Sequence, residues 1–591
     1  MAKGRQTVQL PASQRKHDKP SEQSGTQQAM ENSPFSPKNI LRGVGVALPV
    51  LTLAALLSPV YQETLAPVYG AIPASINHTE TLMATFLIGY VWRVLLQKVH
   101  TDFSILPYLA FWIFWMPGLQ TWIFKYSNGF GPIFGPILTG FLSCHGMMIA
   151  TGYAVSQALE GLALQSQLGD VAGIAIPVVV LDLYLMGMEQ AMSSAFLPWL
   201  RTLSDHFASP VKLQLMIGTC VTMVSPEKPY WMFSLALPAV LYGLLANPHY
   251  DGGRNFDLLN TEIAAVNWTL LDRAWSNTGY VSVLESTDLN YRVMRCDHSL
   301  LGGEWLLTPE RRANGWMVNE PIYSVFEMLE AVRLMEVDPP IRDSDAEALV
   351  VGLGIGTAPR SLMAHGINTT TLELDPKVSE YATKYFALAP GHTVITDAVS
   401  WVSSSSKEES KKYDYILHDV FTGGVEPLSL FTNSFLSDLR NLLAPNGVIG
   451  LNYAGDLSTP LTNLVLNTIH GAFDGQCKIF RDAPPKANSD DAESKEDFLN
   501  MLIFCRNTPG SITFRQPTSK DFLGSKSRAH YLLPKTEWEI SFPTSEDAGV
   551  PAGQVLQAGD EGKWRKEQEE SAIRHWKIMR TVLPAKVWEM W

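Results

Sequence analysis

The chain has 591 residues, of which 46% are hydrophobic and 17% charged, and its formal net charge at pH 7 is −13. This acidic balance argues against a nucleic-acid-binding protein, because phosphate binding needs clustered Lys and Arg. The length allows two or more domains, and the composition changes at about residue 247. Large apolar side chains dominate before that point, and the mixed polarity of a globular protein follows it.

The N-terminal half has the pattern of a polytopic α-helical membrane domain. Residues 1–40 are rich in Gln, Ser, Lys and Pro and are predicted to form a disordered tail. Residues 41–247 are predicted to cross a lipid bilayer six to eight times, because most of their apolar segments approach the length a spanning helix needs. These segments are Leu41–Val60, Leu82–Val99, Ile105–Phe124, Phe130–Val155, Val171–Leu200, Val211–Val224 and Tyr230–Ala246.

Basic residues set the expected orientation of this multi-pass domain. Lys and Arg are frequent before the first span and absent from residues 61–80, so the N-terminus is predicted to be cytoplasmic. Asn77-His78-Thr79 is an N-glycosylation sequon in that loop and would face the lumen. An even number of spans then places the C-terminal half in the cytosol.

Two further features of the sequence bear on the environment of the chain. Asp182 and Glu189 lie in the fifth apolar segment, where they indicate either a polar cavity or a span whose true position is offset. The five cysteines show no paired spacing of a disulfide framework or a metal site, which favours a reducing compartment. They are Cys144, Cys220, Cys296, Cys477 and Cys505.

The C-terminal half begins with a predicted small β-domain and linker helix at residues 255–340. Gly279–Ser286 and Tyr291–Asp297 are typical of a β-hairpin. Residues 345–545 alternate strand and helix patterns, which predicts a Rossmann-like α/β domain with a mostly parallel sheet. Residues 484–497 are predicted to be a solvated loop, and residues 546–591 a tail that packs on the domain or touches a membrane surface.

Polar residues follow successive strands of this predicted sheet. Gly352-Leu353-Gly354-Ile355-Gly356 follows the first strand, where glycines let a ligand approach the backbone. Glu373 ends the second strand and suits both ribose hydroxyls of a nucleoside. Asp397 ends the third strand and suits an adenine amino group, and Asp419 ends the fourth. This series of acids favours an adenosyl sulfonium ligand with an amine acceptor over a dinucleotide.

These motifs resemble the spermidine/spermine synthase (polyamine aminopropyltransferase) family, and its membrane-fused members in particular. The resemblance covers about residues 279–505 and includes "VVGLGIG", "LELDP", "TDA" and "YDYILHDVFTGG". It implies decarboxylated S-adenosylmethionine as donor and a small-molecule amine as acceptor, with no metal. It also implies that Asp419 orients and deprotonates the amine. The candidate site residues are therefore Asp419 and Tyr323 for catalysis, and Gly352, Gly354, Gly356, Glu373, Asp375, Asp397 and Ala398 for donor binding.

The acceptor half of the predicted site departs from the family pattern. Thr422 stands where the family has a second acid, and the motif at residues 319–325 keeps Tyr323 but loses two polar residues. Aminopropyl transfer is thus one hypothesis, methyl transfer from S-adenosylmethionine a second, and a ligand-sensing transporter or scaffold a third. His298 and His418 are further candidate bases, and a second copy of the chain is a candidate partner besides the bilayer.

Overall fold

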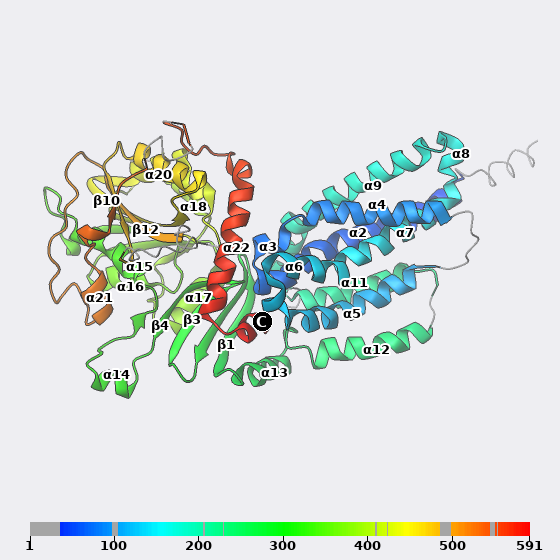
Figure 1. Cartoon of the computed structure of the whole chain (residues 1–591), viewed down its shortest axis with the longest axis horizontal. Helices are drawn as coiled ribbons and strands as arrows, with labels where there is room; N and C mark the ends of the chain where they lie inside the picture. Colours follow the sequence, from blue (N-terminus) through cyan, green and yellow to red (C-terminus); the bar gives the residue numbers. More distant parts are fainter. Residues whose placement is uncertain are drawn as a thin grey trace, which may run out of the picture.

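The computed structural model describes residues 36–96, 104–204, 207, 209–227, 230–407, 411–421, 424–484, 498–543, 550–551 and 553–591. It consists of a helical bundle and an α/β half, which lie end to end with the C-terminal helices between them (Figure 1). Most of the predicted N-terminal tail and of the predicted loop at 484–497 falls outside the described residues.

The helical bundle contains seven long passages within the described residues. They are α2 (Pro37–Tyr69), α4 (His78–Leu96), α5 (Leu106–Phe124), α6 (Ser127–Leu142) continued by α7 (Cys144–Leu159), α9 (Ala172–Ala191) continued to α10 (Leu197–Leu203), α11 (Pro210–Val224) and α12 (Tyr230–Leu245). Two short helices, α3 (Ala71–Ser75) and α8 (Leu164–Leu168), connect passages. Four stretches are long and apolar enough to cross a membrane: Pro37–Tyr69, Ala71–Leu96, Ser127–Leu162 and Ala172–Leu203.

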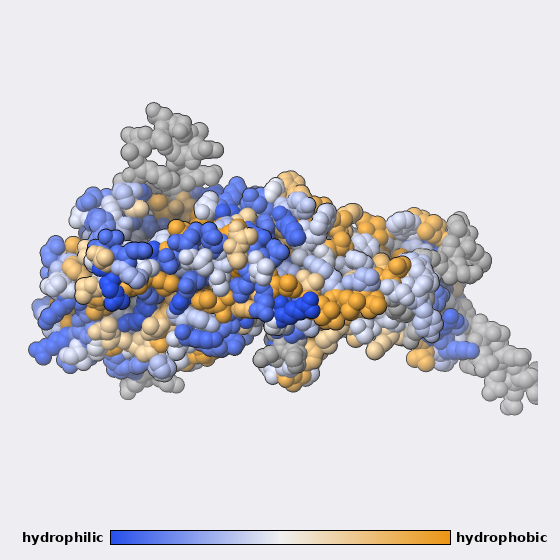
Figure 2. Space-filling view, turned by 90° about the horizontal axis from the view of Figure 1, so that it is seen from below, coloured by the Kyte–Doolittle hydropathy of each residue, from blue (hydrophilic) through white to orange (hydrophobic). Residues whose placement is uncertain are grey.

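The outer surface of the bundle is apolar. Large hydrophobic side chains such as Val171, Leu183 and Tyr230 are exposed there, whereas the α/β half exposes few of them. Figure 2 shows the same contrast, with apolar residues over the bundle and mainly hydrophilic ones over the α/β half. An apolar surface of this extent is unusual for a soluble monomer.

The bundle separates the start of α2 from the α/β half. Helix α2 begins at the far end of the bundle, and its last turn reaches the α/β half, where Arg295 donates to the Pro67 carbonyl at 2.7 Å (Figure 1). If all seven passages crossed a membrane, the N-terminus and the α/β half would lie on opposite sides of it. The count of six to eight spans stays a prediction, since four of the stretches are long and apolar enough to cross a membrane.

The α/β half begins with α13 (Gly253–Ala264) and a five-stranded antiparallel sheet. Its strands, in the order of the sheet, are β1 (Trp268–Ser276), β2 (Gly279–Ser286), β3 (Tyr291–Cys296), β4 (Ser299–Trp305) and β5 (Glu320–Pro321). The predicted hairpin is β2–β3. The predicted linker helix is a short α15 (Val325–Met328) followed by a 3-10 turn to Leu334.

A second sheet of eight strands forms the centre of the α/β half, in the order β13-β11-β12-β10-β9-β6-β7-β8. The strands β6 (Glu347–Val351), β7 (Asn368–Glu373), β8 (Thr393–Ile395), β9 (Tyr413–His418) and β10 (Leu443–Asp456) are parallel to one another. The antiparallel edge is β11 (Cys477–Arg481), β12 (Phe498–Arg506) and β13 (Glu539–Ile540). The Rossmann-like α/β fold is therefore confirmed.

Helices cover this sheet and follow its strands. They are α16 (Thr357–Ala364), α17 (Pro376–Tyr385), α18 (Ala398–Ser405), α19 (Asn433–Leu442) and α20 (Pro460–Ala472). The strand order reverses between β6 and β9, because β6 pairs with β7 on one side and β9 on the other. Ligands of such sheets bind at this reversal, outside the carboxyl ends of the strands.

Cys477 and Cys505 form a disulfide, which the cysteine spacing did not predict. The two residues lie directly opposite each other on the antiparallel strands β11 and β12, with their Cα atoms 4.1 Å apart. The expectation of unpaired cysteines is therefore corrected for these two, because strand pairing brings together residues 28 positions apart.

The predicted C-terminal tail contains two helices, which lie between the two halves. Helix α22 (Arg565–Val582) runs between the bundle and the sheets, and α23 (Ala585–Glu589) follows it (Figure 1). Trp576 Nε1 donates to the Val68 carbonyl at 3.0 Å, and Trp591 stacks on His249 with ring centroids 4.4 Å apart.

Candidate active site

One cavity of about 510 Å³ lies at the carboxyl ends of the parallel strands. Its walls come from the small sheet, the segment before α15, the loops after β6, β7, β8 and β9, strands β10 and β12, and α22. Seven of the nine candidate site residues line it: Tyr323, Gly352, Gly354, Glu373, Asp397, Ala398 and Asp419. Gly356 and Asp375 do not.

The glycine-rich loop after β6 brings backbone close to the cavity. Gly352 has φ +89°, and a Cβ placed on it would lie 2.0 Å from the Asp419 carbonyl oxygen. Gly354 has φ +52°, and its Cβ would lie 2.6 Å from the Leu301 carbonyl oxygen. Only glycine fits these two positions without moving the backbone.

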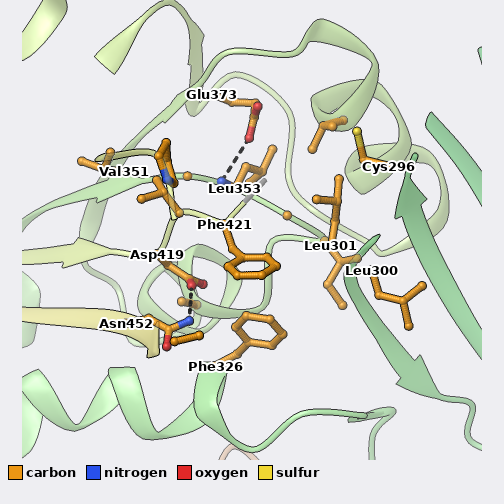
Figure 3. A pocket seen from close by; sticks show the side chains of 18 of the residues that line it. Cys296, Leu300, Leu301, Phe326, Val351, Leu353, Glu373, Asp419, Phe421 and Asn452 are labelled. Atoms are coloured by element: carbon orange, nitrogen blue, oxygen red, sulfur yellow. Dashed lines mark hydrogen bonds between the residues drawn. The ribbon is translucent and has the colours of Figure 1, made fainter. Parts of the chain in front are cut away.

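Glu373 ends β7 beside this loop. One carboxylate oxygen accepts from the backbone N–H of Leu353 at 3.1 Å (Figure 3), and the other accepts from the backbone N–H of Asp375 at 2.8 Å. Burial raises the pKa of Glu373 to about 7, although those backbone hydrogen bonds act to lower it. The carboxyl is therefore fixed against the glycine loop, where it can reach the ribose of a nucleoside.

The two other acids of the predicted donor site have different positions. Asp397 caps the N-terminus of α18 and lines the cavity. Burial acts to raise the pKa of Asp397, but its hydrogen bonds from Ser400 and Val399 outweigh that effect and hold the pKa below its usual value. Asp375 is fully buried, caps α17 and accepts from Thr278 of the small sheet, so the structure gives it a packing role.

Asp419 lies at the end of β9 in the middle of the cavity wall. Its Oδ1 accepts from the Asn452 amide at 3.0 Å (Figure 3). Burial raises the pKa of Asp419 to about 6, while the bond from Asn452 lowers it. The carboxylate is thus ionised at neutral pH but is a stronger base than an exposed Asp, as a proton acceptor requires.

Aromatic side chains form the wall beyond Asp419. Phe326 and Phe421 point into the cavity next to Asp419 and Asn452 (Figure 3). The Tyr323 ring lies 6.0 Å from that of Phe326 in an edge arrangement, and its hydroxyl is buried without a hydrogen-bond partner among the described residues. Thr422, where the family pattern has an acid, lies outside the described residues.

Several residues of the cavity escaped sequence analysis. Asn452 comes from β10, Phe498 and Asn500 from β12, and His575 from α22. Asn452 could have been found from the sequence, because in "GLNY" it lies near the end of a predicted strand of the same sheet, as Asp419 does. His575 could not, because it lies in a charged helical segment more than 150 residues from Asp419.

The two histidines considered as bases are structural. His298 accepts from Arg580 Nε at 3.1 Å and stacks on Trp588 with ring centroids 4.2 Å apart. His418 is buried, and its Nε2 lies 3.0 Å from the Leu430 carbonyl oxygen. Neither lines the cavity. Among the described residues there is no group of three or more His, Cys, Asp or Glu side chains placed to hold a metal ion.

The geometry defines a class of protein. A glycine loop and two strand-end carboxylates, those of Glu373 and Asp419, lie in one cavity at the switch point of a Rossmann-like sheet, as expected of a transferase that uses an adenosyl co-substrate.

Comparison with known proteins gives the family. Residues 325–477 match the spermine/spermidine synthase domain. The N-terminal histidine N-methyltransferase of Emericella nidulans is 40% identical over 567 residues, which cover 93% of this chain and 97% of that protein. The polyamine aminopropyltransferase of Vibrio vulnificus is 34% identical over 109 residues, 18% of this chain and 36% of that protein. The chain belongs to the spermine/spermidine synthase family.

A solved structure described as a probable spermidine synthase from Corynebacterium glutamicum has a TM-score of 0.35 and 13% identity, and covers 49% of this chain and 95% of that one. The family assignment, not this structure, shows that the chain is a transferase, and it confirms the predicted co-substrate, S-adenosylmethionine or the decarboxylated form.

Proposed function

We propose that the protein is an S-adenosylmethionine-dependent methyltransferase that methylates the imidazole of an N-terminal histidine in a polypeptide. The observation that carries this proposal is the similarity to the Emericella nidulans enzyme along nearly the whole chain, both halves included. The two aminopropyltransferases that the chain resembles match only 25% and 18% of it.

The acceptor side of the cavity supports a ring-shaped acceptor rather than a long polycation. A polyamine is a long polycation and needs several acids along its length. Beyond the donor site, the described residues that line the cavity include one acid, Asp419, together with aromatic rings and the amides of Asn452 and Asn500. Aromatic walls suit an imidazole ring, which packs edge-to-face or offset against them.

The proposed reaction assigns Asp419 the role of proton acceptor. A neutral imidazole has one N–H and one nitrogen with a free lone pair. Asp419 accepts the hydrogen bond from the N–H, which leaves the lone pair directed at the donor's methyl carbon. As the new N–C bond forms, the C–S bond breaks and its electrons return to sulfur. The imidazolium proton passes to Asp419, and Asn452 holds that carboxylate in place.

We also propose that the bundle spans a membrane and that the α/β half lies on its non-cytosolic side. The exposed apolar side chains of the bundle support the first part. Lys38 and Arg42 at the start of α2, at the end remote from the α/β half, support the second. Asn77 of the sequon is exposed next to α3, which packs on α22, and the Cys477–Cys505 disulfide suits an oxidising compartment.

Product analysis tests the proposed function. The full-length protein in detergent is incubated with a histidine-first peptide and either S-adenosylmethionine or its decarboxylated form, and the product is sequenced by fragmentation mass spectrometry. We expect one methyl group on the first residue and none on an internal histidine. An aminopropyl group from the decarboxylated donor would favour the polyamine-type alternative, which the match over residues 325–477 supports. Binding of donor with no transfer would favour the ligand-sensing alternative.

A further inference from the structure

The C-terminal helix α22 contributes a polar residue to the acceptor side of the cavity. His575 lines the cavity together with Ile578, Met579 and Val582 from the same face of α22. The side chain of His575 is 7% exposed, and its Nε2 has no hydrogen-bond partner among the described residues. A buried polar atom without a hydrogen-bond partner is uncommon, and a ligand bound in the cavity could supply that partner.

The position of His575 is fixed by its neighbours. Its ring packs against Phe421, with centroids 4.9 Å apart, and against Gly424, where an added Cβ would lie 2.9 Å from His575 Cδ2. The next residue, Trp576, is held by the Val68 carbonyl of the bundle. Arg580 on the following turn donates to Val68 and to Ser127 Oγ, each at 3.0 Å. Contacts with the bundle therefore fix the position of α22, and with it that of His575.

The charges and hydrogen-bonding atoms of this wall determine which chemical groups of a ligand can bind to it. Burial lowers the pKa of His575 to about 4, so the ring is neutral at pH 7 and can accept a hydrogen bond. The described residues that line the cavity include no Lys or Arg. With Asp419 and the free Oδ1 of Asn452, the acceptor side offers mostly hydrogen-bond acceptors, and it suits a cation or an N–H donor.

We propose that His575 is a specificity-determining residue that accepts a hydrogen bond from the α-ammonium of the acceptor's first residue. This inference rests on the proposed function, in which Asp419 binds the imidazole N–H. Phe421 lies two residues after Asp419, and its ring lies beside Asp419 (Figure 3) and packs on His575, so an apolar ring adjoins both hydrogen-bond acceptors. An N-terminal histidine has the same arrangement, because an apolar carbon links its imidazole to the carbon that bears the α-ammonium.

The test compares two peptides that differ only at that amine. One begins with histidine, and the other begins with des-amino-histidine, in which a hydrogen replaces the α-amine. Methyl transfer by the full-length protein in detergent is measured as kcat/KM for both peptides. Because a hydrogen bond to a charged group is involved, we expect the wild type to prefer the amine-bearing peptide by roughly 10- to 100-fold.

The variants separate this contact from a general loss of structure. His575→Phe keeps an aromatic ring but removes the acceptor atom, and we expect it to treat the two peptides nearly alike while it binds S-adenosylmethionine as the wild type does in calorimetry. His575→Gln keeps an acceptor oxygen and should retain part of the preference. Lys577→Gln changes an exposed residue of the same helix and should retain all of it. If His575→Phe does not bind the donor, His575→Ala takes its place in the comparison.

The outcomes distinguish the two proposals. A His575 variant that binds donor and keeps the full preference overturns the assignment of His575 and leaves the proposed function intact. A wild type that methylates both peptides equally overturns it as well. A wild type that binds donor but methylates neither peptide overturns the proposed function, and the role of His575 with it.

Discussion

Replacing Asp419 by Asn is expected to abolish methyl transfer and at the same time to stabilise the folded protein above pH 6. Burial moves the pKa of Asp419 from 3.8 to about 6, so the folded protein disfavours the ionised carboxylate. A shift of about two pH units corresponds to about 3 kcal/mol of free energy of unfolding. Asn has nearly the same shape as Asp and carries no charge, so the variant does not lose the free energy that burial of the ionised carboxylate costs the wild type.

The pH dependence gives the sign of the effect. Below about pH 4 the carboxyl is protonated in both the folded and the unfolded chain, and Asp419→Asn should change stability little. Between pH 4 and 6 the unfolded chain ionises first, so the wild type loses stability relative to the variant. Above pH 6 the difference is constant, at up to about 3 kcal/mol.

Thermal unfolding of the two proteins in the same detergent at pH 4.5 and pH 8 measures this difference, and kcat is measured alongside. We expect kcat to fall by roughly 10²- to 10⁴-fold with the donor dissociation constant within a few fold of wild type. Asp397→Asn is the control, because Asp397 is an exposed helix cap and its loss should not stabilise the protein at either pH. A lower melting temperature for Asp419→Asn at pH 8 would refute the reasoning.

Three further results are expected. The kcat/KM of the wild type should decrease as the pH falls through about 6, where Asp419 is protonated, and a profile that stays flat down to pH 5 would exclude Asp419 as the base. Cys477→Ser should lower the free energy of unfolding by about 3 to 4 kcal/mol, because the disulfide closes a loop of 28 residues, and an unchanged melting temperature with and without reductant would contradict the pairing. Arg295→Met should destabilise the contact between the halves by about 3 kcal/mol, since Arg295 is fully buried and donates to three backbone carbonyls, and unchanged protease resistance would contradict that.

The donor side of the site could be predicted because its signals are local. Each strand of a parallel sheet ends at the same edge, so Gly352, Glu373, Asp397 and Asp419 are brought together once the strands are recognised. Asp375 shows the limit of this reasoning. It stands two residues after Glu373 in the same motif, yet its side chain turns to cap α17 and to bind the small sheet.

The acceptor side could not be predicted because it depends on contacts between distant parts of the chain. His575 reaches the cavity because α22 packs against both the bundle and the small sheet, and no periodicity in residues 565–582 indicates that neighbour. Cys477 and Cys505 likewise meet through strand pairing, which their spacing does not reveal. The orientation of the bundle depended on a count of spans, and one span more or less reverses the side on which the α/β half lies.

The strand ends from Gly352 to Asp419 line one cavity, which we propose binds the S-adenosyl donor. Calorimetric titration of the full-length protein with S-adenosylmethionine, beside its Glu373→Ala variant, tests it most directly. We expect one binding site per chain in the wild type and a dissociation constant at least roughly tenfold higher in the variant, which loses its hydrogen bonds to the ribose. Equal affinity in the two proteins, or no binding to the wild type, would contradict it.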